Sequence, residues 1–177
     1  MARKSYAGKS PWVIHYDGSS CNGCDIEVLA ALTPLYDAER FGVVNTGNPK
    51  HADILIVTGG VNEQNAPVVR QIYEQMLEPK VVVACGACAC GGGVYVECYN
   101  VRGGTATAGI PVDAYVPGCA VRPESVLDAV VAGVKLLDEK AAKMGRNPEE
   151  KRAGAAAERG EDAEATRDDA AREEVRA

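Results

Sequence analysis

The chain has 177 residues, of which 46% are apolar, and a formal net charge of −6. This length suits one domain of ordinary size with an additional tail, and the apolar content is sufficient for a buried core. The acidic balance argues against a nucleic-acid-binding protein. No run of eighteen apolar residues occurs, and the first residues lack the apolar segment of a secretion signal. We therefore expect a cytoplasmic protein that reaches a membrane only through partners.

Predicted strands and helices alternate along the chain. The expected strands are WVIHYD (12–17), FGVV (41–44), ADILIVTGG (52–60), EPKVVVACG (78–86) and VDAYVPG (112–118). The expected helices are one that begins near Asn22 and is limited by Pro34, one over 65–77 and one over 122–144. Near-continuous apolar strands are typical of a parallel sheet buried on both faces. The pattern predicts an α/β fold, an open parallel sheet with helices on both faces.

Composition divides the chain into three parts. Residues 1–10 are basic and polar, and we expect a flexible arm there. Residues 11–145 carry the predicted α/β domain. Residues 146–177 are rich in alanine and in charges of both signs, with almost no bulky apolar residue. Such a tail buries too little surface to offset chain entropy, so we expect it to be disordered or a solvated helix.

Seven cysteines suggest where the chemistry lies. Their number is odd and no secretion signal is evident, so a framework of disulfides is not expected. They occur at positions 21, 24, 85, 88, 90, 98 and 119. Three predicted strands are each followed directly by cysteines, namely the strands that end near 17, 86 and 118. Because the carboxyl ends of parallel strands meet at one edge of a sheet, at least four sulfur atoms are expected to converge.

Convergent thiolates bind an iron–sulfur cluster or zinc. CNGC (21–24) and CGAC (85–88) together form a CxxC…CxxC pattern that suits zinc. A full α/β core does not need a structural zinc, however, and this pairing leaves Cys119 unused. A thiol–disulfide site is a third alternative, since CNGC is placed to open a helix, but it does not explain the other thiols. The spacing favours an iron–sulfur cluster and leaves all three open.

Three motifs, in this order, resemble those of a known family: SSCNGCDIE (19–27), GACACGGGVY (86–95) and IPVDAYVPGC (110–119), the last followed by a helix that begins Pro-Glu. They resemble the small subunit of membrane-bound, energy-converting [NiFe] hydrogenases, including the formate hydrogenlyase type. The superfamily also contains the B subunit of NADH–quinone oxidoreductase, respiratory complex I. The resemblance covers about residues 10–138.

The resemblance implies a flavodoxin-like fold and one [4Fe–4S] cluster, with Cys21, Cys24, Cys88 and Cys119 as its ligands. It implies that the chain is not catalytic alone but transfers electrons beside the nickel–iron centre of a partner large subunit. A ferredoxin-like iron–sulfur subunit and ion-translocating membrane subunits would complete the complex on the inner face of the cell membrane. The CxxC at the first motif resembles the hydrogenase branch, since the complex I branch has adjacent cysteines there.

Two alternatives to the hydrogenase function stay open. One is the quinone-reducing B subunit of a complex I type of enzyme, and the other is a zinc-stabilised scaffold protein. The chain also departs from the family pattern, because Ala120 stands where a proline is common after the last cysteine. Cys90 stands where relatives commonly have no thiol, and we interpret it as a small residue in a glycine turn rather than an alternative ligand.

Several other residues receive roles from their positions. We expect Gly86, Gly91, Gly92 and Gly93 to let the backbone pass close to the cluster. Asp25 and Glu27 are interpreted as carboxylates that favour the first turn of a helix, with proton transfer as the alternative. His15 and His51 are treated as isolated structural residues, and Trp12 and Phe41 as core residues. Cys85 is expected in the core, Arg102 at the surface or paired with an acid, and Cys98 receives no role.

Overall fold

The computed structural model describes residues 10–144. The arm predicted over 1–10, except Ser10, and the tail predicted over 146–177 lie outside the described residues. Contacts divide the chain into one unit that ends at Lys140 and another that begins at Ala141, and the account below concerns the first unit.

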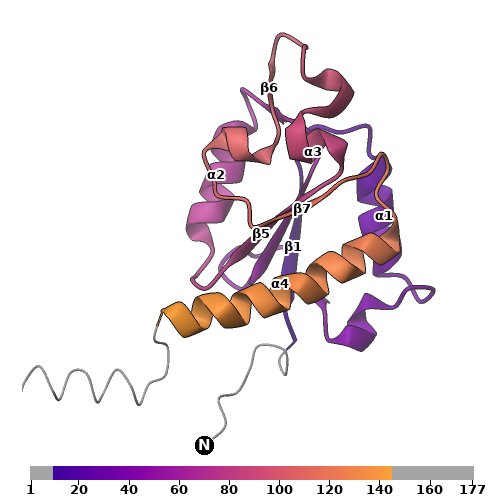
Figure 1. Cartoon of the computed structure of the whole chain (residues 1–177), viewed down its shortest axis with the longest axis vertical. Coiled ribbons are helices and arrows are strands. Elements are labelled where there is room, and N and C mark those ends of the chain that lie inside the picture. The colour runs from indigo at the N-terminus through magenta and orange to yellow at the C-terminus, as the bar shows by residue number, and fades with distance from the viewer. Residues whose placement is uncertain (1–9, 145–177) are drawn as a thin grey trace, which may run out of the picture. The chain divides into compact units, whose positions relative to one another are not determined.

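Strands and helices alternate along the chain much as the sequence predicts (Figure 1). The strands are β1 (Trp12–Asp17), β2 (Val44–Asn45), β3 (Ile54–Thr58), β4 (Val61–Asn62), β5 (Val81–Cys85), β6 (Val101–Gly103) and β7 (Ala114–Val116). The α-helices are α1 (Gly23–Ala31), α2 (Ala66–Gln75), α3 (Ala87–Gly91) and α4 (Pro123–Lys143). Short 3₁₀ helices, η2 (Ala38–Phe41), η3 (Gly93–Tyr95) and η4 (Thr105–Ala108), lie in the connections.

The main sheet is parallel. Within the described residues its strands lie in the order β2-β1-β3-β5-β7. Counted in chain order within this sheet, the arrangement is 2-1-3-4-5, which is the strand order of flavodoxin-like folds. Every residue of β3 and β5 is buried, as their continuous apolar runs predict. The predicted open parallel sheet is confirmed.

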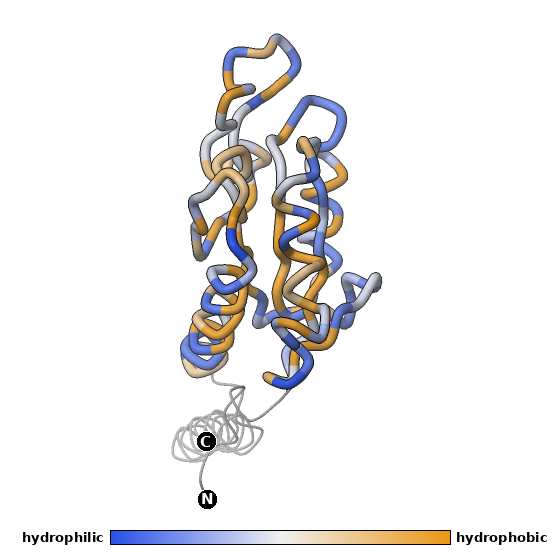
Figure 2. Tube along the Cα trace, turned by 90° about the vertical axis from the view of Figure 1, so that its right-hand side faces the viewer, coloured by the Kyte–Doolittle hydropathy of each residue, from blue (hydrophilic) through white to orange (hydrophobic). Residues whose placement is uncertain are grey.

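Helices cover both faces of this sheet. Successive side chains of a strand point to opposite faces, and β3 accordingly feeds two hydrophobic clusters. Ile54 and Ile56 pack in the cluster that includes residues of α1 and α4. Leu55 and Val57 pack in the other cluster, which includes residues of α2 and η4. In Figure 2, hydrophilic residues gather mainly in the connecting loops. The fold is therefore three-layered, with helices on both sides of the sheet.

The strand predicted over 41–44 is wrong in position. Phe41 ends the 3₁₀ helix η2, and β2 contains only Val44 and Asn45. Gly42 ends this helix in a left-handed conformation, φ +83°, and its N–H donates to Glu39 O at 2.8 Å. The chain extends only after this turn, so the side chain of Phe41 faces outward and is 60% exposed. Trp12 is 38% exposed, and the prediction of both residues as core is also wrong.

A second, antiparallel pair of strands was not predicted. β4 follows β3 almost directly and pairs with β6, with Val61 opposite Gly103. Strands of two and three residues are too short to show a period in the sequence. The pairing holds the segment after α3 near the carboxyl end of β3. In the part of the chain that the structure describes, no helix is long and apolar enough to cross a membrane.

Candidate metal centre

Loops from three strands meet at the carboxyl edge of the sheet. Cys21 and Cys24 lie between β1 and α1 or at the start of that helix, Cys88 lies in α3 directly after β5, and Cys119 follows β7. The N–H of Ala87 donates to Gly118 O at 2.8 Å and joins the second loop to the third. A Cβ atom at Gly23 would stand 3.4 Å from that of Ala120, so the first loop also touches the third.

The thiols of these loops lie within electrostatic range of one another. Burial raises the pKa of the Cys88 thiol, and negative charge on Cys119, Cys21 or Cys24 raises it further. Burial also raises the pKa of Cys24, where charges on Asp25, Cys119 and Cys21 act in the same direction and a backbone hydrogen bond from Val121 opposes them. Ionising one thiol therefore hinders ionising the next. A bound cationic centre would remove this repulsion, because thiolates are the form that binds metal.

Glycines make room for two of the sulfur atoms. A Cβ atom on Gly86 would stand 2.6 Å from Cys24 Sγ, and one on Gly93 would stand 2.9 Å from Cys88 Sγ. Both glycines have positive φ, +96° and +55°. Gly92 packs against Gly103 and Val96 instead, and Gly91 has nothing within 4 Å. Two of the four expected glycines thus lie against sulfur atoms.

The four candidate ligands differ in exposure. Cys21 and Cys119 are exposed, whereas Cys24 and Cys88 are half-buried. Across residues 10–144, no three His, Cys, Asp or Glu side chains are arranged to hold one metal ion. The thiols thus converge without enclosing a point that one ion would occupy. A cluster of four irons takes one thiolate at each iron and so accepts sulfur atoms that are farther apart. The donor set, the glycines and the spacing fit such a group.

The remaining cysteines do not join these four. Cys85 is buried at the end of β5, and burial raises the pKa of its thiol to about 12, with charges on Cys24, Cys90 and Asp25 adding to the effect. Cys90 lies two residues after Cys88 in α3, about 200° around a helix, and its thiol lies 3.6 Å from Ala84 O. It belongs to a helix and not to the expected glycine turn. Cys98 is exposed in the loop after η3.

Comparison with known proteins decides the family. The model of the family described as NADH ubiquinone oxidoreductase, 20 kDa subunit, matches residues 21–133. The chain belongs to this family. It is 52% identical to the probable membrane-bound hydrogenase subunit mbhJ of Pyrococcus furiosus, over 78% of this chain and 80% of that protein. It is 39% identical to formate hydrogenlyase subunit 7 of Escherichia coli, over 75% of this chain and 51% of that protein.

A third relative and two solved structures extend the comparison. A B-type subunit of the NADH-quinone oxidoreductase of Symbiobacterium thermophilum is 47% identical over 70% of this chain and 66% of that protein. A chain of the membrane-bound sulfane sulfur reductase, an archaeal respiratory membrane complex, matches with a TM-score of 0.60 and 35% identity, over 78% of this chain and 73% of its own. A chain of an NAD⁺-reducing [NiFe]-hydrogenase matches with a TM-score of 0.56 and 20% identity, over 71% and 93%. The last likeness shows the fold alone.

In this member of the 20 kDa subunit family, sequence reasoning missed a polar network beside the thiols. Asp25 follows Cys24 directly and is buried, 8% exposed. Its carboxylate accepts hydrogen bonds from Ser20 and Thr58 and pairs with His15 Nε2 at 2.9 Å. His15 is therefore not isolated, and Asp25 does more than complement a helix dipole. The aspartate beside the CxxC was a visible signal, but nothing in the sequence pointed to its distant partners.

Arg102 pairs within the chain. Its guanidinium donates to the carboxylate of Glu63, and both side chains are largely exposed. Glu63 adjoins β4 and Arg102 belongs to β6, so the pair connects the two strands of the small sheet. Its position outside the thiol cluster gives it no part in the candidate centre.

Proposed function

We propose that the chain is the electron-transfer subunit of a membrane-anchored, ion-translocating [NiFe]-hydrogenase complex. In this proposal it carries one [4Fe–4S] cluster bound by Cys21, Cys24, Cys88 and Cys119. The observation that carries the proposal is the meeting of three strand-end loops, which bring these thiols into electrostatic range of one another. Membership in a family of oxidoreductase subunits supports it.

The chain's own residues account for what a cluster needs. Four thiolates close the coordination of the irons, and the bound cluster would take up and release single electrons. The backbone of Val121 supplies a hydrogen bond to the sulfur of Cys24, which favours its charged form. Gly86 and Gly93 leave space at the sulfur atoms of Cys24 and Cys88. The buried strand ends below these loops keep water from the inner side of the centre.

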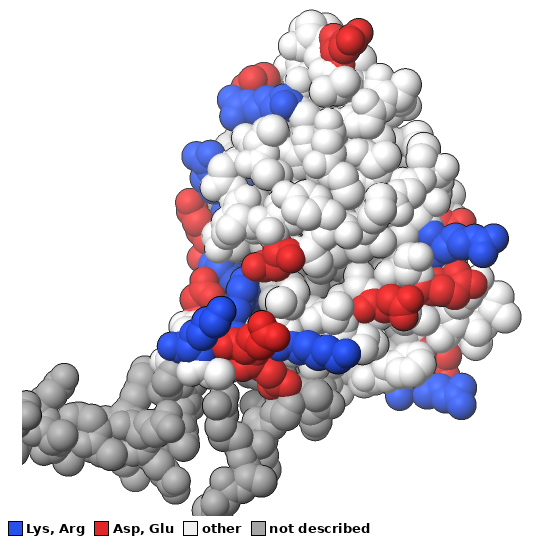
Figure 3. Space-filling model, viewed as in Figure 1, with Lys and Arg blue, Asp and Glu red and all other residues white. Residues whose placement is uncertain are grey.

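The outer side of the centre suits a protein partner. Figure 3 shows few charged residues over the region of α3 and η3, with most of the charged groups in this view gathered at the other end of the described unit. Val94, Val96 and Tyr99 are exposed just after α3, and Cys21 and Cys119 are exposed as well. A partner on this face would exclude water, which is one of the factors that set a cluster's potential.

The names of the relatives suggest which partners these are. The Pyrococcus relative is named as a subunit of a membrane-bound hydrogenase and the Escherichia relative as a subunit of formate hydrogenlyase. We assign the exposed face to a large subunit with a nickel–iron centre. A ferredoxin-like iron–sulfur subunit and ion-translocating membrane subunits would complete the complex, with this chain peripheral on the inner face of the membrane.

The quinone-reducing B subunit of a complex I type of enzyme is the second candidate. Relatives with 47% identity carry that name, which is close to the value for the hydrogenase relative. The CxxC spacing of Cys21 and Cys24 favours the hydrogenase type. A zinc-stabilised scaffold is the weakest alternative, because one tetrahedral zinc, with Zn–S bonds of about 2.3 Å, needs thiolates closer together than an iron–sulfur cube does.

The test uses the full-length chain, tagged and purified without oxygen together with whatever subunits accompany it. The proposal expects about four irons and about four acid-labile sulfides per chain, a large subunit that co-purifies, and hydrogen turnover. Quinone reduction without hydrogen turnover would favour the second candidate. One zinc per chain and no iron would leave only the scaffold.

A further inference from the structure

Polar residues enclose the segment that carries the first two cysteines. Ser20 precedes Cys21, and Asp25 follows Cys24. The hydroxyl of Ser20 accepts a hydrogen bond from Asn22 N at 2.9 Å and donates to Asp25 Oδ2 at 2.5 Å. These bonds close a ring across the CNGC turn, so that its conformation depends on the carboxylate of Asp25.

The other oxygen of Asp25 ties this turn to the sheet. Oδ1 accepts a hydrogen bond from the hydroxyl of Thr58, the last residue of β3. It also lies 2.9 Å from Nε2 of His15 on β1. A carboxylate can only accept, so Nε2 carries the hydrogen. One side chain thus joins the cysteine turn to the carboxyl ends of two strands.

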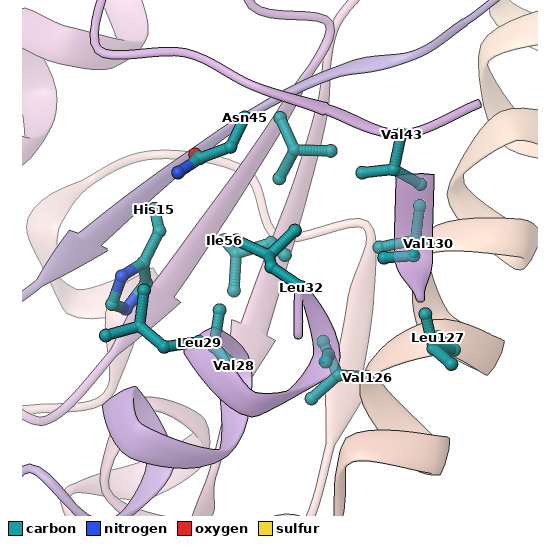
Figure 4. Close-up of a pocket in the computed structure, with 13 residues that line it drawn as sticks. His15, Val28, Leu29, Leu32, Val43, Asn45, Ile56, Val126, Leu127 and Val130 are labelled. Carbon is teal, nitrogen blue, oxygen red and sulfur yellow. The ribbon is translucent and has the colours of Figure 1, made fainter. Parts of the chain in front are cut away.

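The surroundings of His15 leave little else to anchor it. The ring borders a small apolar hollow of about 30 Å³ between β1, β3, α1 and α4. Val28, Leu29 and Ile56 lie around it (Figure 4). Among the described residues, its polar partners lie on the Nε2 side, at Asp25 and at Thr58, whose Oγ1 is 2.9 Å away. The imidazole therefore serves the carboxylate.

The charge of Asp25 acts on the neighbouring sulfur atoms. Burial disfavours the carboxylate, but hydrogen bonds from Ser20 and Thr58 and the nearby His15 outweigh it, so the pKa of Asp25 is lowered. The same negative charge contributes to the raised pKa values of Cys24 and Cys85. A fixed negative charge beside a redox centre opposes the addition of an electron.

We propose that Asp25 is a positioning residue that locks the Cys21–Cys24 turn onto the ends of β1 and β3 and holds one negative charge beside the sulfur centre. The inference rests on the proposed function, because it concerns the same centre. It predicts two separable effects of Asp25, one on how firmly the cluster is held and one on its reduction potential.

Two substitutions of Asp25 separate these effects in the anaerobically purified complex. Asp25→Asn and Asp25→Ala both remove the charge, but only asparagine keeps an oxygen that accepts hydrogen bonds. We expect both variants to shift the midpoint potential to more positive values by a similar amount. We expect cluster loss during incubation with an iron chelator to be severalfold faster in Asp25→Ala than in Asp25→Asn. Asp128→Asn, an exposed aspartate of α4, is the matched control and should change neither quantity.

Threonine variants test positioning without a change of charge. Thr58→Val removes the hydroxyl that binds Asp25, whereas Thr58→Ser keeps it. Thr105→Val is the control, because Thr105 is equally buried and its hydroxyl has no hydrogen-bond partner among the described residues. Thr58→Val should lose the cluster severalfold faster than wild type, and Thr58→Ser and Thr105→Val at the wild-type rate.

The outcomes distinguish the two proposals. An iron-free wild-type complex contradicts the proposed function and this inference with it. A wild-type complex that contains the cluster, combined with an unchanged potential in Asp25→Asn or with equal cluster loss in Thr58→Val and Thr105→Val, overturns only the role of Asp25.

Discussion

Gly86 lies directly against the sulfur of Cys24, so that a Cβ atom on Gly86 would stand 2.6 Å from Sγ. The glycine also has φ +96°, a conformation that L side chains rarely adopt. Five residues later, Gly91 has neither constraint, since nothing lies within 4 Å of its Cβ position. The two glycines thus offer a test of the centre that leaves every thiol in place.

Gly86→Ala is expected to lose the cluster, because the new methyl group displaces a ligand sulfur and strains the turn by about 1–2 kcal/mol. Gly91→Ala is the control and should keep wild-type iron content. Iron and sulfide analysis of the anaerobic complex measures both, and circular dichroism checks that each variant is folded. Equal iron content in the two variants would contradict the placement of the centre.

Removal of single thiols tests the ligand set. Cys21→Ser, Cys24→Ser, Cys88→Ser and Cys119→Ser are each expected to abolish the intact cluster, because one iron loses its protein ligand in each variant. Cys98→Ser should leave it in place, since Cys98 is exposed in a separate loop. Electron paramagnetic resonance of the reduced complex, with iron analysis, distinguishes them. A full cluster in Cys88→Ser together with its loss in Cys90→Ser would show that the third ligand is misassigned.

Cys85 is expected to resist thiol reagents, whereas Cys98 reacts. Cys85 is 1% exposed and its pKa is raised to about 12 by burial, so both access and thiolate are lacking. Mass spectrometry after brief anaerobic treatment with iodoacetamide at pH 8 locates the labelled residues. Labelling of Cys85 as fast as of Cys98 would mean that the end of β5 opens readily.

The same pKa predicts a dependence of stability on pH. Between the ordinary value of 9.0 and about 12, the folded chain keeps the Cys85 proton that the unfolded chain loses. The free energy of unfolding should therefore fall as pH rises through this window, by at most about 1.4 kcal/mol per pH unit from this group. Urea unfolding at pH 9–11 should show a smaller slope in Cys85→Ala than in wild type. Identical slopes would rule out this contribution.

Lys80 is expected to stabilise the end of α2. It is 7% exposed, and its ammonium donates to Tyr73 O at 2.8 Å and to Met76 O at 3.2 Å. Lys80→Met leaves these carbonyls without their charged donor and should lower the free energy of unfolding by about 2 kcal/mol. Lys50→Met, at an exposed lysine, should change it by less than about 0.5 kcal/mol. Urea unfolding compares the two, and similar values would refute the capping role.

The sequence predicted the fold where hydrophobic patterns are long. β3 and β5 are fully buried parallel strands, and their continuous apolar runs made them recognisable. β4 and β6 are two and three residues long and were missed, because their pairing arises from tertiary contact. The strand predicted over 41–44 failed because the turn at Gly42 delays the extended chain.

The candidate site divides in the same way. That the thiols meet at one edge followed from parallel strands alone, since each cysteine motif comes after a strand. The partners of Asp25 did not follow, because they depend on how β1 and β3 pair. His15 lies opposite Ile56 in that register, so Thr58 is its diagonal neighbour on the same face. A shift of one residue would separate the two side chains, and no local pattern specifies such a shift.

The order of the strands also sets a timetable for maturation of the protein. Cys21 and Cys24 leave the ribosome early, but Cys119 follows β7, the last strand of the main sheet to be made. At synthesis rates of roughly 5–20 residues per second, the early thiols wait about 5–20 seconds for the last one. Delivery of iron and sulfide must therefore come after nearly the whole domain has been translated, and the nascent chain needs protection from oxidation until then.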